Sequence, residues 1–144
     1  MAASTKYLKK IKDLAAKNLQ EGITFLQENG KRSTVITTLS GLQYEVLNTG
    51  TGLLPSKTSK IVCHYSGQLL DGTVFDSSYK RKRPETFEIK DLIAGWQEAL
   101  LLMPVGSRWR VYIPHDKAYG FQSLTTTSGG NCTLIFEMEL LGVL

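Results

Sequence analysis

The side chains that could build a functional site in this 144-residue sequence are aromatic rather than nucleophilic. The rings expected at strand and helix ends are Tyr65, Phe75, Phe87, Trp96, Tyr119 and Phe136. Such rings can form an aromatic-rich core or line an apolar pocket. A pocket is favoured because Tyr119 lies in the loop sequence KAYG, where a core ring is less expected. Asp76 and Arg81 also lie near Phe75, in a segment expected to cap a sheet.

Residues for covalent, metal or nucleotide chemistry lack the patterns that such chemistry requires. The sequence has no G-x-S-x-G, Walker, H-E-x-x-H or G-x-G-x-x-G motif. His64 and His115 are expected to be structural or surface residues, since a general base must lie within reach of its partner. Cys63 alternates with apolar residues and is expected in the core. Cys63 and Cys132 have no C-x-x-C or zinc-ligand spacing, so no metal or cofactor is expected, and their pairing is left open.

The elements that would position these rings follow from hydrophobic periodicity. Strands are predicted where apolar and polar side chains alternate, at residues 42–46, 61–65, 108–113 and 134–140. Asp71-Gly72 predicts a hairpin ahead of Phe75. Residues 91–103 predict a helix with Asp91 as its N-cap and Pro104 after its end. Several strands around one short helix indicate an α+β fold with an antiparallel sheet.

Residues 1–40 are predicted to be a basic helical arm and linker, ahead of a folded domain at residues 41–144. The apolar side chains of an N-terminal amphipathic helix recur every three or four positions, at Leu8, Ile11, Ala15, Leu19, Ile23 and Leu26. Residues 1–39 hold seven of the 17 Lys and Arg residues but three of the 13 Asp and Glu residues. The expected interpretation of this positive charge is a solvated helix face. A basic arm could also bind nucleic acid, an anionic membrane or an acidic partner.

The lysines of the arm bear on its partners and its location. They interrupt every apolar run, so neither a signal peptide nor a membrane span is predicted, and the expected location is the cytoplasm. Nucleic-acid binding is not favoured, because Tyr7 and Phe25 stand almost alone as stacking rings among these lysines.

Three stretches resemble one protein family. They read VCHYSGQLLDGTVFDSS at 62–78, LIAGWQEALLLMPVGSRWRVYIPHDKAYG at 92–120 and NCTLIFEMELL at 131–141. In this order and near this spacing they resemble the FKBP family of peptidyl-prolyl cis/trans isomerases, over about residues 41–144. The basic arm followed by GLQYEVLNTGTG is similar to the bacterial subgroup related to Mip proteins. The helical region of that subgroup commonly dimerises, which implies a homodimer through the N-terminal helix.

The resemblance implies an antiparallel half-barrel curled around the short helix, with a proline pocket between them. The implied catalytic residues are Tyr65, Phe75, Asp76, Trp96, Tyr119 and Phe136. The implied substrate-binding residues are Arg81, Phe87, Leu92 and Ile93. Trp96 would form the floor of the pocket. The Tyr65 hydroxyl would reach the Asp76 carboxylate, and Arg81 would pair with Asp76.

The implied activity is rotation about X-Pro bonds without a cofactor. An apolar slot favours the twisted amide, because rotation reduces the charge separation of the planar form. The Ile93 N–H and the Tyr119 hydroxyl would hold substrate carbonyls, and Asp76 would orient rather than remove a proton. The implied partners are proline-containing polypeptides and macrolide inhibitors such as tacrolimus or rapamycin. The alternative is a chaperone or binding module for proline-containing segments with little turnover.

Two departures from the family pattern bear on substrate preference and macrolide affinity. Glu85 stands where family members commonly have an aromatic residue, so one rim of the pocket is expected to be polar. The loop at 121–131 lacks the apolar and proline residues that many members carry beside the pocket.

Overall fold

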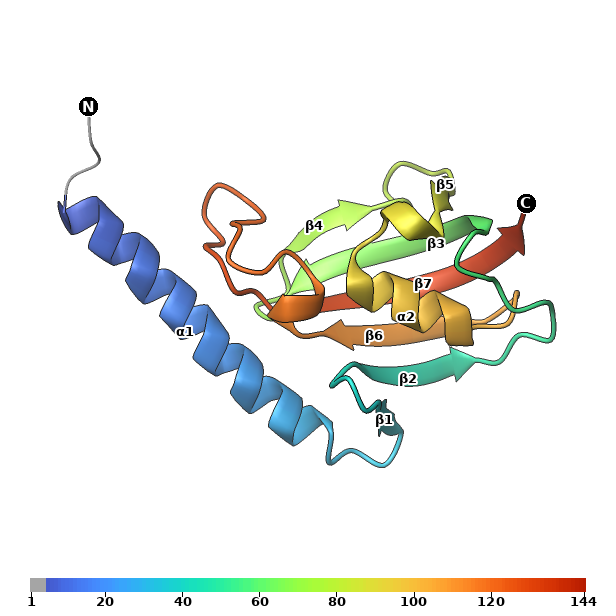
Figure 1. The fold of residues 1–144 in the computed structure, drawn as a ribbon, viewed down its shortest axis with the longest axis horizontal. Coiled ribbons are helices and arrows are strands. Elements are labelled where there is room, and N and C mark those ends of the chain that lie inside the picture. Colours follow the sequence, from blue (N-terminus) through green and yellow to red (C-terminus); the bar gives the residue numbers. More distant parts are fainter. Residues whose placement is uncertain (1–4) are drawn as a thin grey trace.

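An open antiparallel sheet with one short helix on its concave face and one long helix beside it forms the fold (Figure 1). The structure is a computed structural model and describes residues 5–144. Its helices are α1 (Thr5–Asn29) and α2 (Ala94–Leu102), with 3₁₀ turns η1 (Ile89–Asp91) and η2 (His115–Lys117). Its strands are β1 (Val35–Thr37), β2 (Gln43–Asn48), β3 (Lys60–Leu69), β4 (Val74–Ser77), β5 (Glu85–Glu88), β6 (Arg108–Ile113) and β7 (Leu134–Val143).

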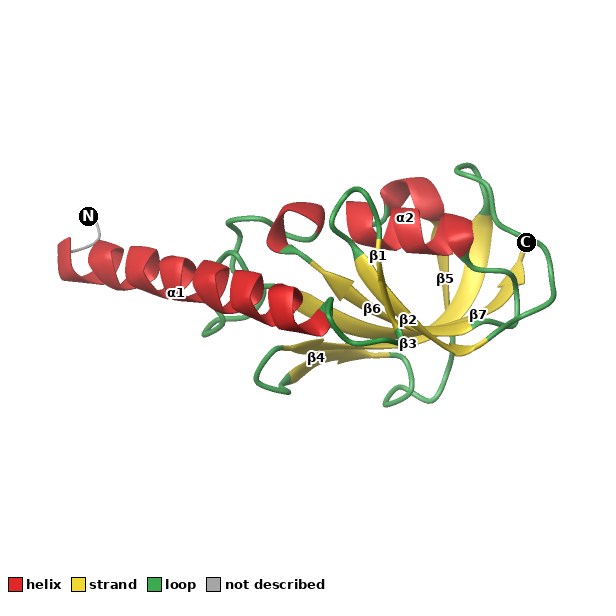
Figure 2. Ribbon diagram, turned by 90° about the horizontal axis from the view of Figure 1, so that it is seen from below, coloured by secondary structure: helices red, strands yellow, loops and turns green. Residues whose placement is uncertain are grey.

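The sheet runs in the order β1-β2-β6-β7-β3-β4, and β5 pairs with β3. Every strand pairing is antiparallel, so the predicted α+β class with an antiparallel sheet around a short helix is confirmed. The predicted hairpin joins β3 to β4, and Gly72 at its turn has a φ of 91°, which glycine adopts without strain. The sheet curls, and α2 lies across its concave side (Figure 2).

The core fills the space between α2 and the sheet. The predicted alternation holds in the central strands, because successive side chains of a strand point to opposite faces. Buried side chains on the inner face include Ile61, Cys63, Tyr65, Trp109, Val111, Ile113, Leu134, Phe136, Met138 and Leu140. Cys63 is therefore a core residue, as expected, and both cysteines are free thiols.

The position of α2 depends on a glycine in its first turn. A Cβ at Gly95 would lie 2.5 Å from the Ile113 side chain of β6. No side chain fits there without displacing the strand or the helix. Gly95 thus brings α2 close to β6 and directs its neighbour Trp96 into the concave side of the sheet.

The start of the short helix differs from its prediction. The helix begins at Ala94 rather than at residue 91, and its N-cap is Ile93 without a side-chain cap. Asp91 ends the η1 turn instead of capping a helix, so its assignment as N-cap is wrong. Leu92 and Ile93 have ψ values of 162° and 152°, which interrupt the helix between two turns. Their spacing matches a helical stripe, which is why the sequence does not reveal the break.

The segment predicted as a linker contains a strand. Val35–Thr37 forms β1 and pairs with β2, with Val35 opposite Glu45 and Thr37 opposite Gln43. This short run of three residues carries no alternation long enough to distinguish a strand from a loop. Strand β1 continues the sheet beyond β2 and connects the N-terminal arm to the sheet through backbone hydrogen bonds.

Helix α1 packs on the domain through the face that carries the predicted stripe, but only from Ala15 onward. Of the predicted apolar stripe, Ala15 is buried, whereas Leu8, Ile11 and Ile23 are exposed. The buried positions of α1 are Ala15, Gly22 and Asn29. Their seven-residue spacing corresponds to two helical turns, so the three residues lie on one face of the helix. The contact with the domain is therefore made by small residues and an amide. None of the helices within residues 5–144 has the length and apolar character needed to cross a membrane.

A polar cluster fixes the C-terminal end of α1 on the outer face of the sheet. The Tyr112 hydroxyl donates to one oxygen of Glu45, and Arg32 and Thr34 donate to the other at 3.0 and 2.7 Å. Asn29 donates to the Gln43 side chain at 2.9 Å. The hydrogen bond from Tyr112 is the largest cause of a lowered Glu45 pKa, and burial opposes it. The cluster therefore holds an ionised carboxylate with a donor for each of its oxygens.

Replacing Tyr112 with Phe should lower the free energy of unfolding by about 1.5–3 kcal/mol near neutral pH, the usual worth of a hydrogen bond to a charged group. The Glu45 pKa lies below its ordinary value of 4.5 in the folded protein. Its contribution is therefore complete above that ordinary value and is lost as the pH falls through the folded pKa. The stability gap between wild type and Tyr112→Phe, measured by urea unfolding, should narrow as the pH falls from about 6 to about 3.

Tyr44→Phe is the matched control, because it removes a hydroxyl outside the cluster and keeps the ring stacked on Trp109 at 4.1 Å. It should leave this pH dependence unchanged. A gap for Tyr112→Phe that stays constant over the whole pH range would show that Glu45 ionisation does not stabilise the fold.

Candidate functional site

A slot of about 260 Å³ opens between the start of α2 and the concave face of the sheet. It is lined by Tyr65, Phe75, Asp76, Phe87, Asp91, Leu92, Ile93, Trp96, Tyr119 and Phe136. These side chains come from β3, β4, β5, β7, η1, the two residues between η1 and α2, α2 itself and the loop after η2. The fold thus brings together nine of the ten residues predicted for a site. Arg81 does not line the slot, and Asp91 does so although the sequence analysis treated it only as a cap.

Trp96 forms the floor of this slot. Its side chain is buried, and its ring stands edge-on to Phe87, Phe136 and Tyr65, at centroid distances of 5.8, 5.2 and 5.0 Å. Edge-to-face packing is favourable for aromatic rings and fixes their mutual orientation. Within residues 5–144, Trp96 Nε1 is the one fully buried side-chain nitrogen or oxygen without a hydrogen-bond partner. An unpaired buried donor costs free energy, so this position is not optimised for stability alone.

Gly67 on β3 makes room for the two rings that flank the floor. A Cβ at this position would lie 2.5 Å from the Phe136 ring and 2.7 Å from the Phe75 ring. The rings of Phe75 and Phe136 meet edge-to-face at 5.6 Å directly over this glycine. The sequence analysis quoted Gly67 only as part of a motif and assigned it no role. A glycine inside a predicted strand is the signal that could have indicated a close approach.

The polar edge of the slot is a hydrogen-bonded set of three side chains. The Tyr65 hydroxyl donates to Asp76 Oδ2 at 2.7 Å, as the resemblance implied. Arg81 donates to Asp76 Oδ1 through Nη1 and to the Tyr65 hydroxyl through Nη2 at 2.9 Å. Arg81 thus supports the slot from behind, and the expected pair with Asp76 is present. The three groups hold one another in place without closing the slot.

The Tyr65 hydroxyl is a neutral donor at every physiological pH. Burial raises the pKa of Tyr65 to about 12, and its hydrogen bond to the Asp76 carboxylate acts in the same direction. The guanidinium of Arg81 opposes this shift. The hydroxyl therefore keeps its proton and its orientation toward Asp76.

Glu85, the acidic residue expected at one rim, is itself paired. Glu85 accepts a hydrogen bond from Arg81 Nε at 3.2 Å, and Arg83 lies 3.9 Å from the same oxygen. Glu85 follows the basic run at 79–83 and balances part of its charge. Glu85 is not among the residues that line the slot, so the polar rim stays a prediction, and its carboxylate is shared between two arginines rather than an isolated charge.

Two further groups lie at the mouth of the slot. Ile93 is the N-cap of α2, and the first N–H groups of a helix lack partners within it. Tyr119 is 41% exposed, and burial of the rest of its ring raises its pKa, so its hydroxyl is also a neutral donor. Both can donate a hydrogen bond to a carbonyl bound in the slot.

The histidines and cysteines do not contribute to the slot. His64 Nδ1 lies 2.8 Å from the Ser78 hydroxyl, and its ring stacks on Tyr79 at 4.6 Å. Burial raises the pKa of the Cys63 thiol to about 12, which leaves it protonated and unreactive. Within residues 5–144, no cluster of His, Cys, Asp and Glu side chains could hold a metal ion. The slot is suited to bind and orient an apolar group and its flanking carbonyls.

An antiparallel sheet curled over a short helix, with an aromatic slot between them, defines an FKBP-type domain. The chain belongs to the family of FKBP-type peptidyl-prolyl cis-trans isomerases, because the model of that family matches residues 52–141. Residues 1–46 match the domain found amino-terminal to these isomerases.

Curated relatives show the same relationship. The chain is 48% identical over 124 residues to the FKBP-type 22 kDa peptidyl-prolyl cis-trans isomerase of Escherichia coli (strain K12), which covers 86% of this chain and 60% of the relative. It is 44% identical to the outer membrane protein MIP of Legionella longbeachae, covering 90% of this chain and 55% of that protein. The chain thus spans little more than half the length of these relatives.

Solved structures agree with this assignment. The crystal structure of FkpA from Escherichia coli superposes with a TM-score of 0.89 at 34% identity, covering 94% of this chain and 63% of that chain. A peptidyl-prolyl cis-trans isomerase from Pseudomonas syringae pv. tomato superposes with a TM-score of 0.81 at 30% identity, covering 99% and 98% of the two chains.

Replacing Asp76 with Asn should lower the Tyr65 pKa from about 12 toward its ordinary value of 10.0, because the carboxylate no longer favours the protonated phenol. Titration of the tyrosine Cζ resonances by NMR measures this change directly. Asp71→Asn, at the exposed β3–β4 turn, is the matched control and should leave Tyr65 unchanged. A Tyr65 pKa that does not move in Asp76→Asn would show that the hydrogen bond between them is not formed in solution.

Proposed function

We propose that this chain accelerates cis/trans rotation about X-Pro bonds in polypeptide substrates. The observation that carries the proposal is the aromatic slot with Trp96 as its floor and a neutral, pre-oriented polar edge. A five-membered proline ring is apolar and flat, so it suits a floor of one indole flanked by phenyl rings. Because the chain spans only part of its curated relatives, its activity, substrates and partners are inferred from this site.

The physical task is to lower a barrier of about 18–20 kcal/mol for rotation of the peptide bond. Rotation interrupts amide resonance, so the twisted amide carries less charge separation than the planar one. An apolar, water-poor slot penalises the planar form more, which lowers the barrier. A thousandfold acceleration needs only about 4 kcal/mol of preferential binding to the twisted form. No proton transfer is required for this.

Each part of the slot has a role in this mechanism. Trp96 supports the proline ring, and Phe75 and Phe136 prevent it from shifting sideways. The Ile93 N–H and the Tyr119 hydroxyl hold the carbonyls on either side of the rotating bond, so that the two sides can turn relative to each other. Asp76 orients Tyr65 and contributes a fixed negative charge, and it does not act as a base. Phe87 and Leu92 complete the apolar wall.

The slot also suits macrolide inhibitors such as tacrolimus or rapamycin, which we propose as ligands. An apolar ring over Trp96 and a carbonyl near Ile93 or Tyr119 would use the same contacts as the substrate. If the arginine-paired carboxylate of Glu85 borders the bound ligand, affinity should be weaker for ligands that bury an apolar group beside it.

We further propose that α1 joins two copies of the chain. Its N-terminal half extends beyond the sheet in both ribbon views, and Leu8 and Ile11 are exposed there (Figures 1 and 2). A helix is marginal in water unless its apolar face packs on something. Leu8 and Ile11 lie one turn apart on one side of the helix, so a second copy of the same helix would cover both.

Location in the cytoplasm remains a proposal. It is supported by two free cysteines, which suit a reducing compartment. One relative is named an outer membrane protein, so fractionation of the native cells is the direct test. Recovery of the chain with the envelope fraction would overturn the proposal.

Wild-type protein should accelerate isomerisation of a short X-Pro peptide, measured by exchange NMR. Phe75→Ala should lower kcat/KM about tenfold or more, because it removes a flanking ring worth at least 1.4 kcal/mol of transition-state binding. Leu102→Ala is the matched control, since this side chain is exposed at the far end of α2 and should change kcat/KM less than about twofold. Thermal unfolding of each variant confirms that it is folded.

Asp76→Ala separates the proposed mechanism from general-base catalysis. It should lower kcat/KM only in part, because the apolar slot and the carbonyl contacts remain. Complete loss of activity in a folded Asp76→Ala protein would contradict an orienting role. Binding of the peptide without acceleration by folded wild type would instead identify a binding module for proline-containing segments.

The wild-type chain should have twice its mass of 16.0 kDa in light scattering at high concentration. The double variant Leu8→Lys, Ile11→Lys should be monomeric, because burying two lysines in the contact is unfavourable. Adding the same charges at the exposed polar positions Gln20 and Gln27 should leave the dimer intact. A monomeric wild type, or a dimer that survives lysines at both apolar positions, would exclude this interface.

A further inference from the structure

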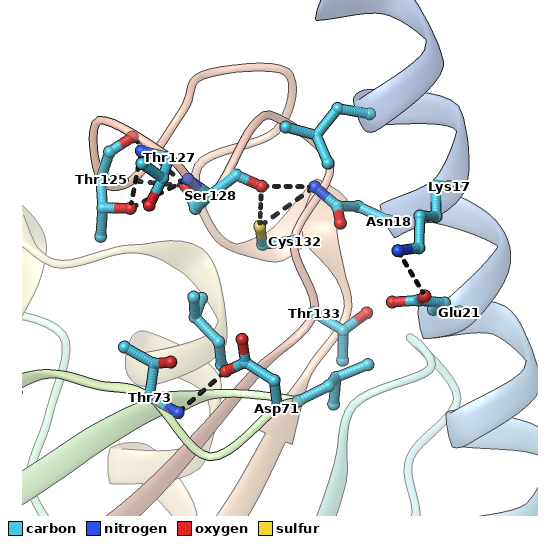
Figure 3. A pocket seen from close by; sticks show the side chains of 13 residues that line it. Lys17, Asn18, Glu21, Asp71, Thr73, Thr125, Thr127, Ser128, Cys132 and Thr133 are labelled. Carbon is cyan, nitrogen blue, oxygen red and sulfur yellow. Dashed lines mark hydrogen bonds and ion pairs between the residues drawn. The ribbon is translucent and has the colours of Figure 1, made fainter.

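The loop between Tyr119 and Thr133 separates two hollows of the molecule. On one side it supplies Tyr119 to the aromatic slot. On the other side it lines a second cavity of about 320 Å³, between the loop, α1 and the β3–β4 turn (Figure 3). The residues of this second cavity include Asn18, Glu21, Asp71, Thr125, Ser128 and Cys132. The loop is therefore in contact with α1 and with the slot at the same time.

One side chain of α1 holds this loop. Asn18 Nδ2 donates to the backbone carbonyl of Ser128 at 2.7 Å (Figure 3) and to that of Gly130 at 2.9 Å. The same nitrogen lies 3.7 Å from Cys132 Sγ. In the opposite direction, Asn131 Nδ2 donates to the carbonyl of Ala15 at 3.3 Å. The amide of Asn18 thus bridges two carbonyls two residues apart and fixes the path of the loop between them.

The backbone of the loop approaches α1 and its own beginning very closely. A Cβ at Gly129 would lie 2.6 Å from the Leu14 side chain, and a Cβ at Gly130 would lie 2.1 Å from the Phe121 carbonyl. The Asn131 N–H donates to the Gly120 carbonyl at 2.8 Å. The segment held by Asn18 is therefore bonded directly to the residue that follows Tyr119.

Helix α1 has anchors of its own that do not involve Asn18. The polar cluster around Glu45 fixes its C-terminal end, and a Cβ at Gly22 would lie 2.2 Å from Thr133 Oγ1, just before β7. By contrast, the part of the loop from 123 to 128 is held mainly by short-range bonds among its own hydroxyls and backbone. The helix is the fixed support and the loop is the part that depends on it.

We propose that Asn18 is a positioning residue for the aromatic slot. Through its two hydrogen bonds to the loop, α1 fixes the position of Tyr119. The position of Tyr119 in turn determines which residues next to proline the slot prefers. The proposal rests on the proposed function only in that the slot binds proline-containing peptides. Asn18 does not touch the substrate. Its effect passes through Gly130, Asn131 and Gly120 to the neighbouring Tyr119.

The first test measures the loop itself. Asn18→Leu keeps nearly the same side-chain shape without its donors, and Asn18→Ala removes the side chain while favouring the helix. Either variant should increase hydrogen exchange of the Asn131 amide, which donates to the Gly120 carbonyl, about 5- to 30-fold, the effect expected from losing two hydrogen bonds. Exchange at Val111 in β6 should not change. Gln27→Ala, at an exposed amide on the same helix, is the matched control.

The second test measures the slot. For a set of peptides that differ only before the proline, Kd from NMR titration should rise at least about threefold for the tightest peptide, because a loosened loop spends less time in the binding-competent position. The spread of Kd across the set should narrow. Across the peptides, KM should rise in the same rank order as Kd. The value of kcat should change less than about twofold, since Trp96 and Ile93 are not displaced. A change in overall stability would not produce this split.

Unchanged exchange at Asn131 in both folded variants would overturn the proposal, because the loop would then not depend on Asn18. Faster exchange with unchanged peptide preference would overturn it as well, because the loop would then not act on the slot. If folded wild type binds the peptides without accelerating their isomerisation, the proposed function fails while Kd still decides the role of Asn18.

Discussion

The close approach of α2 to the sheet is the constraint on which the slot depends. Gly95 lets the helix rest on Ile113, and this contact sets the depth at which Trp96 enters the concave face. Three other rings then meet the indole edge-on, from three different strands. Since close-packed interiors respond to changes of a single methylene, a larger residue at position 95 would displace the floor and every ring that rests against it. The aromatic slot is thus a consequence of how one helix packs.

The molecule uses the same chemical grouping twice, in different surroundings. Tyr65, Asp76 and Arg81 form it at the slot, and Tyr112, Glu45 and Arg32 form it on the outer face. In each, a phenol donates to a carboxylate whose charge an arginine balances. The outer set is more deeply buried at its carboxylate and anchors α1, whereas the carboxylate of the slot is 42% exposed. One arrangement holds the arm, and the other keeps a binding surface polar at one edge and rigid.

The predictability of each feature from sequence depends on the range of the interaction behind it. Alternation along β3, β6 and β7 reflects local geometry, so the buried face of each strand could be predicted. The start of α2 could not, because Leu92 and Ile93 keep helical spacing while their backbone is extended. The roles of Gly67 and Gly95 depend on side chains from distant segments, and a sequence shows only that a glycine is present. The contribution of Gly22 and Asn29 to the contact of α1 could not be predicted, because hydrophobic periodicity gives no weight to glycine or to an amide. Leu8 lies on the same helix face but remains exposed, since the contact begins only at Ala15.

The reaction that we propose for the slot only rotates a bond, so it leaves little basis for chemical discrimination between substrates. The proline ring and its amide are the same in every X-Pro sequence, so the floor of the slot cannot tell one substrate from another. Preference must therefore come from contacts with the neighbouring residues, which lie at the mouth of the slot near Tyr119. A loop rich in hydroxyl groups would be a poor selector if it moved freely, because ordering it on each binding event costs free energy. On our proposal, holding the loop in advance against an anchored helix removes part of that cost, through a hydrogen bond between residues 110 positions apart in sequence.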